Sequence, residues 1–124
     1  MLLFLNLRKK DFTAYKYRYS LQEYVHVHHI IPLEWRSKAN LKGYDVDKGY
    51  NLMFMPNKIG KTNINTVRRN HEGGHMKYNK YINERLEHEC PFEISSEVRH
   101  KLMNNIDIPW KWLELSFRPG SNRG

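Results

Sequence analysis

The sequence predicts a small single domain of the α+β class that spans residues 1–124, and three observations support this prediction. The length of the chain fits one compact core, and 40% of its residues are hydrophobic, which suffices for a packed interior. Two short apolar stretches end at a proline, where a strand commonly stops. A third stretch repeats apolar residues at helical spacing.

Two strands are expected, one on either side of a polar loop. The stretch YVHVHHII is rich in β-branched residues and closes at Pro32, so His28 and His29 should lie at the end of the first strand. The stretch NLMFMP, which opens on Asn51, predicts a short buried strand that stops at Pro56.

Two helices are expected in the second half of the chain. After the glycine pair at 73–74 the pattern becomes helical and should continue to about Glu89. Either Ser95 or Ser96 could cap a further helix through Met103, because a serine hydroxyl accepts from the free amides of a first turn. The residues that share the inward face of the first of these helices are His75, Tyr78, Ile82 and Leu86.

The other segments leave alternatives open. Residues 1–7 predict a first strand or a short helix, and they are far shorter than the ~20 residues of a membrane span, so no membrane partner is expected. Residues 13–24 fit either a strand or an amphipathic helix. A loop with room for a short helix is expected over 33–50, and a basic connection over 57–70. The aromatic segment 110–115 should pack back on the core.

The charge balance suits a polyanionic partner. Lysine and arginine number 21 against 13 acidic residues, which gives a formal net charge of +8 and a pI near 9.6. Excess positive charge also keeps proteins dispersed in solution, so charge alone does not assign a function.

Five of the seven histidines fall in two clusters, which scattered core histidines would not do. Neutral imidazole is the commonest protein ligand for zinc-like metals, and residues four apart at the start of a helix can address one ion. Because Cys90 is the only cysteine, a cysteine-rich zinc cage is excluded. The first cluster is His26, His28 and His29, and the second is His71 and His75.

The order His-His, then Asn, then His-x-x-x-His resembles the HNH nucleases of the His-Me finger superfamily, in which two strands and a helix enclose one divalent ion. The closer resemblance is to the AHH family. Three motifs carry it over about 60 residues, namely HHIIP at 28–32, NLMFMP at 51–56 and HEGGHMKY at 71–78. The sequence departs from the family at Val27, where alanine is typical, and in a long basic gap before the third motif. The resemblance implies a ββα-metal finger at the centre of the domain, over about 24–89.

The resemblance also implies a role for each motif residue. His29 would be the general base, since imidazole takes up a proton near neutrality. Asn51 would tie the two strands together and orient His29 through its amide. The ligands of one divalent ion (Zn, Ni, Mn or Mg) would be His28, His71 and His75. Independently of the resemblance, the basic residues around the second histidine cluster that are expected to hold a nucleic-acid backbone are Arg68, Arg69 and Lys77.

Strand geometry leaves one alternative open in this ligand set. Successive strand residues face opposite ways, so His28 and His29 cannot both face one ion. The implied scheme does not require this, because His29 can approach the water from the side if the strand ends there. In a strand that continues straight, His26 and His28 would share a face and form the metal pair instead.

Two other functions compete with a nuclease. HEGGH also matches the HExxH motif of zinc peptidases, in which Glu72 would activate the water. Against this, each glycine inside a helix costs about 1 kcal/mol relative to alanine, so a catalytic helix centred on two glycines is disfavoured. The second competitor is a non-catalytic module that binds nucleic acid around a structural zinc, with His26 completing a closed ligand set.

The sequence and the resemblance together predict a metal-dependent endonuclease that hydrolyses DNA, and RNA is the alternative substrate. The AHH resemblance further suggests a toxin or effector nuclease with a neutralising immunity protein as its partner. Such a toxin would act in the cytoplasm and could be secreted or delivered as part of a larger protein.

Overall fold

Residues 7–71, 75–106 and 108–110 are described by the computed structural model, in which helices surround a two-stranded antiparallel sheet. The strands β1 (Val25–His29) and β2 (Leu52–Pro56) pair with His29 opposite Leu52 and Val25 opposite Pro56. The α-helices are α2 (Lys9–Arg18), α3 (Arg36–Leu41), α4 (Lys58–Asn63), α5 (Met76–Leu86) and α6 (Pro91–Met103), and the short 3-10 helices are η1 (Leu33–Trp35) and η2 (Gly49–Asn51). The predicted α+β class and both predicted strands are thereby confirmed.

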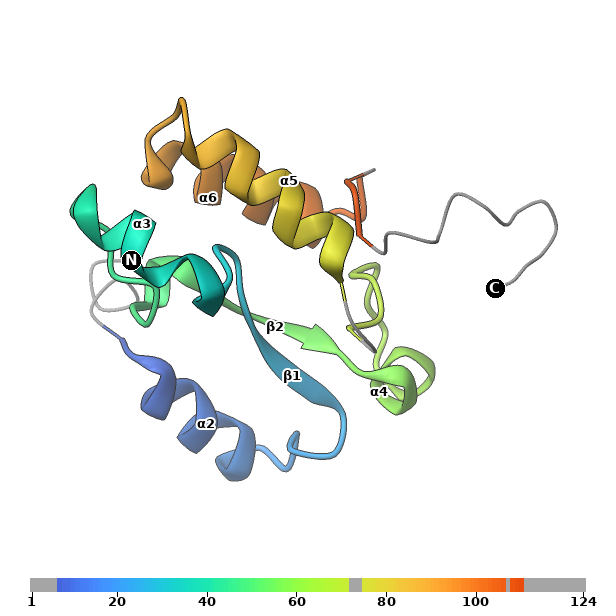
Figure 1. Ribbon diagram of the computed structural model, residues 1–124. Helices are drawn as coiled ribbons and strands as arrows, with labels where there is room; N and C mark the ends of the chain where they lie inside the picture. Colours follow the sequence, from blue (N-terminus) through green and yellow to red (C-terminus); the bar gives the residue numbers. More distant parts are fainter. Residues whose placement is uncertain (1–6, 72–74, 107, 111–124) are drawn as a thin grey trace, which may run out of the picture.

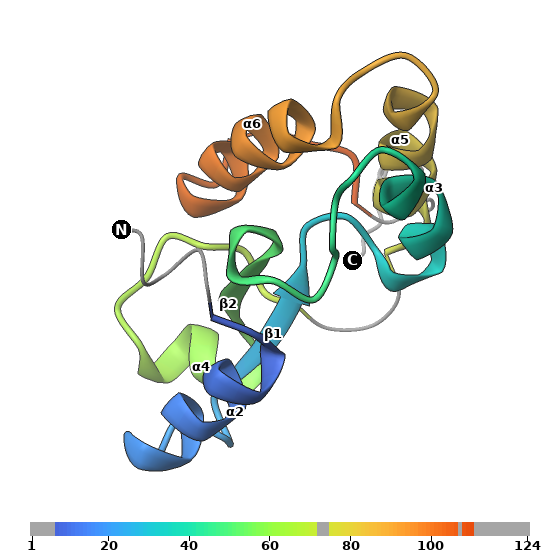
Figure 2. The same ribbon diagram turned by 90° about the vertical axis from the view of Figure 1, so that its left-hand side faces the viewer.

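The helices cover the sheet from two sides. Figures 1 and 2 show α5 and α6 on one side of the hairpin and α2 on the other. Because strand residues alternate, His28 faces α5, where its ring lies 5.2 Å from that of Tyr78. Phe54 faces α2, where its ring lies 5.3 Å from that of Phe12. The two faces of the hairpin therefore lie in different environments.

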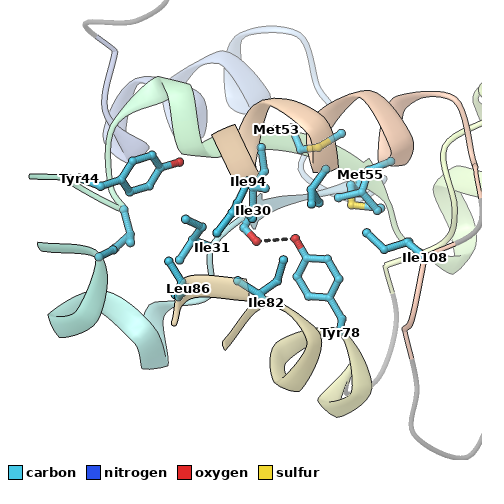
Figure 3. Close-up of a cluster of buried hydrophobic side chains, with 14 of the residues drawn as sticks. Ile30, Ile31, Tyr44, Met53, Met55, Tyr78, Ile82, Leu86, Ile94 and Ile108 are labelled. Atoms are coloured by element: carbon cyan, nitrogen blue, oxygen red, sulfur yellow. Dashed lines mark hydrogen bonds between the residues drawn. The ribbon is translucent and has the colours of Figure 1, made fainter. Parts of the chain in front are cut away.

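The main core fills the space between the hairpin and the helices α5 and α6 (Figure 3). Ile30 and Ile31, which follow β1 directly, are fully buried there. The inward face expected for α5 is confirmed at three of its four positions, since Tyr78, Ile82 and Leu86 are each at most 2% exposed. The fourth, His75, lies at the cap of the helix and is half-buried.

The expected serine cap of α6 is wrong. The helix begins at Pro91, with Cys90 as its cap residue, so Ser95 lies in the helix interior and donates to the carbonyl of Phe92. Proline suits the first helical position because its fixed φ is already helical and the missing amide would have no partner there. The helix ends at Met103 as expected.

The structure has helices in three segments whose secondary structure the sequence did not settle. Of residues 13–24, for which a strand or a helix was expected, 13–18 are helical and belong to α2, which starts at Lys9 and ends at Arg18. The short helix expected within 33–50 is present as α3. The basic connection over 57–70 contains α4, which the sequence did not predict, and whose first turn is capped by Asn57 through a 2.7 Å bond from the amide of Gly60.

Some expectations concern residues outside the described ranges. They are the first strand or helix over residues 1–6, the glycine pair with Glu72, and the aromatic segment beyond Trp110. Trp110 itself is buried in the main core. Among the described residues, no helix is both long and apolar enough to cross a membrane.

Candidate active site

Three histidines from separate parts of the chain meet between β1 and α5. His28 comes from β1, His71 from the segment after α4, and His75 from the cap of α5. One nitrogen atom from each lies within 4.8 Å of the others. The indole ring of Trp110 packs against all three imidazoles at centroid distances of 4.8–5.8 Å. These are the three residues expected to be metal ligands.

The orientation of His28 is determined by Tyr78. The Tyr78 hydroxyl donates to the carbonyl of Ile30, so its oxygen accepts from Nε2–H of His28 at 3.2 Å. Burial raises the pKa of Tyr78 well above its usual value, which keeps the hydroxyl protonated. Nδ1 of His28 is then the ring nitrogen with a free lone pair, and it faces Nε2 of His71 at 3.0 Å.

Asn79 plays the corresponding part for His75. The side-chain amide of Asn79 donates to the carboxylate of Glu34 at 2.9 Å, because an ionised carboxylate can accept hydrogen bonds but cannot donate them. The Asn79 Oδ1 atom is therefore the acceptor for Nδ1–H of His75, also at 2.9 Å. This leaves Nε2 of His75 available to an ion, and neither Asn79 nor Glu34 was identified from the sequence.

His71 is held by backbone and side-chain contacts to both strands. Its amide donates to the carbonyl of Pro56 at 2.7 Å, which places it directly beyond the end of β2. Nδ1 of His26 lies 2.8 Å from the carbonyl and 3.0 Å from Nδ1 of His71. His26 and His28 thus share one face of β1, as the straight-strand alternative required, but the three-histidine group of the described residues does not include His26.

The donor set fits one divalent ion. Metal–nitrogen bonds of about 2.0–2.1 Å place two ligand nitrogens roughly 3 to 3.5 Å apart, and the His28–His71 pair already has that separation. Ligation also requires neutral imidazole. Burial, followed by the neighbouring His71 and His75, lowers the pKa of His28 well below its usual value, so this ring is neutral near pH 7.

His29 lies at the end of β1 and is paired with a carboxylate. Nε2 of His29 is 3.1 Å from Oδ1 of Asp47, and the side chain of His29 is only 9% exposed. Burial lowers the pKa of His29 although Asp47 opposes the shift. Because the carboxylate accepts, the neutral ring carries its hydrogen on Nε2, and Nδ1 is left with the lone pair that a base needs.

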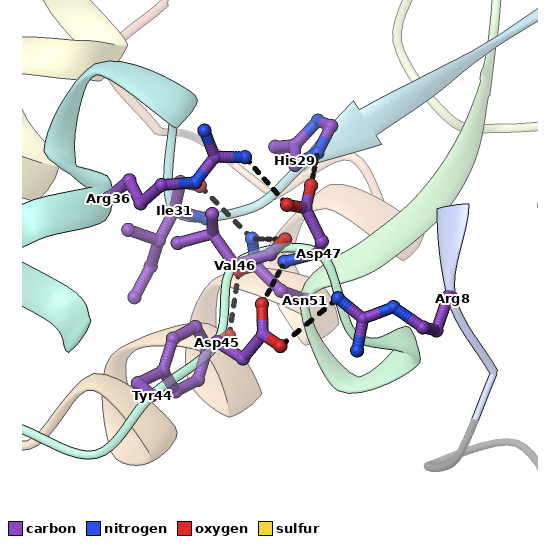
Figure 4. Close-up of polar contacts among 9 residues, drawn as sticks. All are labelled: Arg8, His29, Ile31, Arg36, Tyr44, Asp45, Val46, Asp47 and Asn51. Atoms are coloured by element: carbon purple, nitrogen blue, oxygen red, sulfur yellow. Dashed lines mark hydrogen bonds and ion pairs between the residues drawn. The ribbon is translucent and has the colours of Figure 1, made fainter. Parts of the chain in front are cut away.

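Asp47 is itself held in a network of polar contacts (Figure 4). Arg36 donates to its second oxygen at 2.6 Å, and its own amide donates to Asp45 at 2.9 Å. Partial burial acts to raise the pKa of Asp47, but the hydrogen bonds from His29 and Arg36 outweigh it and hold this pKa below its usual value. Asp47 was missed in the sequence, where the only signal was a pair of aspartates in the loop GYDVDKGY.

Asn51 ties the two strands together, but it does not touch the ring of His29. Its fully buried side chain accepts from the amide of Ile31 at 2.7 Å and donates to the carbonyls of Ile31 and Val46 at 3.0 and 2.8 Å. The expectation of a direct amide contact to His29 is therefore corrected. Asn51 acts on the backbone at positions 31 and 46, while Asp47 provides the partner of the ring.

The three basic residues expected to meet nucleic acid have different surroundings. Nη1 of Arg68 donates to the carbonyl of Phe54 at 2.7 Å, so part of this guanidinium is committed to the fold. Arg69 lies over the ring of Trp110 at 4.9 Å, and its Nη1 is buried without a hydrogen-bond partner among the described residues. Lys77 is half-buried in the first turn of α5.

Replacing Tyr78 with phenylalanine should destabilise the protein and weaken metal binding. Tyr78→Phe removes the donor to Ile30 and the acceptor for His28 inside the core, which should cost about 1–3 kcal/mol of unfolding free energy. It should also lower metal affinity about 10- to 100-fold, as the loss of a ligand's orienting partner does. Urea unfolding and calorimetry measure the two effects.

The matched control is Tyr81→Phe on the same helix, because the half-buried Tyr81 hydroxyl contacts Arg85 and no histidine. This variant should keep the metal affinity of the wild type. Equal metal affinities for the wild type and Tyr78→Phe would show that the hydroxyl does not orient His28.

The arrangement agrees with a comparison against families of known proteins. A model for AHH, a nuclease family of the HNH/ENDO VII superfamily with conserved AHH, matches residues 11–90 of this chain. The matched segment is more than half of the chain and includes both histidine clusters and Asn51. At the family's AHH motif this chain has Val27-His28-His29. No curated protein and no solved structure matches the chain.

Proposed function

Because this chain belongs to the AHH family of nucleases within the HNH/ENDO VII superfamily, we propose that it is a metal-dependent endonuclease that hydrolyses the phosphodiester bonds of DNA. The observation that carries the proposal is that a potential general base and a potential metal site lie next to each other at the end of β1. A neutral histidine held by a carboxylate follows directly after a histidine that belongs to a potential metal site.

His29 is the general base in this proposal. Asp47 accepts from Nε2–H and thereby directs the Nδ1 lone pair toward the attacking water. Asp47 stays ionised and so stabilises the imidazolium that forms when His29 takes up the proton. Since His29 and the three-histidine group use opposite faces of β1, the scissile phosphate would lie across the end of the strand, where the chain turns at Ile30.

The ion would be held by His28, His71 and His75. When bound, a divalent ion neutralises charge on the phosphoryl oxygens and stabilises the leaving oxygen. The all-nitrogen donor set suits zinc or nickel, whereas manganese and magnesium prefer oxygen ligands. Three protein ligands leave a coordination position free, which is typical of a catalytic site.

Arg69 and Lys77 are the basic residues best placed to bind the substrate backbone. Nη1 of Arg69 has no hydrogen-bond partner among the described residues, and the guanidinium lies over Trp110, which itself packs against the three histidines. A buried guanidinium nitrogen without a partner costs free energy, and a phosphate oxygen would supply the missing acceptor. Lys77 follows His75 by two residues and would add a second positive charge.

The two competing functions have less support. The zinc-peptidase alternative has less support because the matching family is one of nucleases. A structural zinc requires a closed set of four ligands, whereas the potential metal site among the described residues contains three.

Plasmid cleavage tests the proposal directly. Purified protein should nick or linearise supercoiled DNA when zinc, nickel, manganese or magnesium is added, and not in the presence of a chelator. Asp47→Asn should slow this cutting at least about 10-fold, and by less than loss of the base itself would, because the general base alone contributes about 100- to 10,000-fold. Metal affinity should stay unchanged in this variant. Plasmid that stays intact with every metal, while RNA is degraded, would show that the substrate is RNA.

A biological role as a toxin or effector nuclease is proposed on the AHH resemblance alone. In that role the protein would act in the cytoplasm of a target cell, alone or as part of a larger secreted toxin, and an immunity protein would neutralise it. Normal growth of cells that express the active protein would contradict the role.

A further inference from the structure

We propose that the aromatic face formed by Phe12 and Tyr15 of α2, by Tyr19 at the C-terminal cap of this helix and by Phe54 of β2 binds an unpaired base of a single-stranded nucleic acid. The inference rests on the proposed nuclease function and deepens it, because it names a substrate form and a contact outside the histidine site. Of these residues only Phe54 lies within a motif of the AHH resemblance, the segment NLMFMP at 51–56.

A cavity of about 290 Å³ lies between α2 and β2 on this face. Three aromatic rings, Phe12, Tyr15 and Phe54, form most of its wall, and Leu7 and Asp11 complete it. The volume is close to that of the smallest pockets that hold small molecules, which start at about 300 Å³, so one planar base fits. Asp11 is the single charged residue of the wall, and its carboxylate repels a phosphate but can accept from the amino group of a base.

The aromatic rings continue from the cavity onto the surface of the helix. Phe54 lies 5.3 Å from Phe12 and 5.6 Å from Tyr15, and Tyr15 lies 4.6 Å from Tyr19. Tyr15 and Tyr19 remain 49% and 55% exposed, so much of their ring surface is uncovered by the protein. Exposed aromatic rings in a row are the usual platform on which the bases of a single strand stack.

The charge of α2 fits the same ligand. The helix carries Lys9, Lys10, Lys16 and Arg18 against the single acid Asp11, and all except Lys16 and Asp11 are exposed. A strand whose bases stack on tyrosines needs cations nearby for its phosphates, and a purely apolar partner would not.

The cavity lies on the same side of the sheet as His29, the proposed general base. His29 alternates with His28 and so shares a strand face with Val27, which pairs with Phe54. At the start of α2, the charge of Lys9 acts on the His29 ring. A nucleic-acid strand bound along α2 would therefore come close to His29, which is proposed to activate the attacking water.

The test is binding of labelled 12-nucleotide single strands without metal and with chelator, so that cleavage plays no part. One strand carries all its bases, and a second carries abasic sites at its four central positions. We expect the strand with bases to bind about 5- to 100-fold more tightly, which is the usual effect of stacking one base. Tyr15→Ala should remove most of this difference, and Tyr15→Trp should retain it.

Tyr17→Ala is the matched control, because Tyr17 is 65% exposed on the same helix but does not line the cavity. It should leave both affinities unchanged. Equal binding of the two strands by the wild type would overturn the proposal, as would an equal loss in Tyr17→Ala and Tyr15→Ala. A Tyr15→Ala variant that binds normally but melts at a lower temperature than Tyr17→Ala would show that the protein's own apolar residues fill the cavity, which also overturns the proposal.

The binding test can succeed or fail independently of the plasmid-cleavage test of the proposed function. Base-dependent binding that Tyr15→Ala removes would support the stacking site even if no metal promotes cutting. Cutting by a protein that binds both strands equally would leave the nuclease standing and the stacking site refuted.

Discussion

His29→Ala should reduce plasmid cleavage about 100- to 10,000-fold, which is the contribution that a general base typically makes. Metal affinity should remain that of the wild type, because His29 bonds to Asp47 and not to the three histidines that would hold the ion. The two measurements are initial rates of plasmid nicking and calorimetric titration with zinc or nickel.

His100→Ala is the control for this variant, because His100 is exposed on α6, where its ring hydrogen-bonds to Asn104 of the same helix end. It should cut at the rate of the wild type. Cutting that survives in His29→Ala would refute the assignment of the base. A His29→Ala protein that has also lost its metal would instead place His29 among the ligands.

His75→Ala should weaken zinc or nickel binding by more than the 10- to 100-fold that follows when only an orienting partner of a ligand is lost. The imidazole lies at the cap of α5, where Asn79 holds Nδ1 and leaves Nε2 for the ion. Because His75 is half-buried and lies at the helix end, the variant should still fold. His28→Ala should have a similar effect on affinity but lower stability as well, since His28 is buried beside Tyr78.

His88→Ala is the control for metal binding, because His88 is an exposed histidine outside the three-histidine group. Thermal melting with and without a chelator separates a catalytic ion from a structural one. The chelated protein should remain folded, whereas a structural zinc would be needed for folding. Unchanged affinity in both His28→Ala and His75→Ala would refute the ligand set.

Much of the local structure can be predicted from the sequence, because strands and amphipathic helices leave a period in the pattern of apolar residues. The alternation in VHVHH indicates a strand in which His26 and His28 share a face, and the structure has this arrangement. The spacing of Tyr78, Ile82 and Leu86 indicates the buried face of α5. Segments without a period, such as α4 and the start of α6, were missed or misplaced.

The sequence alone therefore determined the family, the two strands and the order of the histidines, since all of these reside in short runs of neighbouring residues. Only the tertiary structure paired His29 with Asp47 across 18 positions and His28 with His71 across 43. Loops have no repeating geometry, so the position of a loop carboxylate depends on how the whole chain packs. Side-chain hydrogen bonds such as those of Tyr78 and Asn79 likewise form only after packing has brought the elements together.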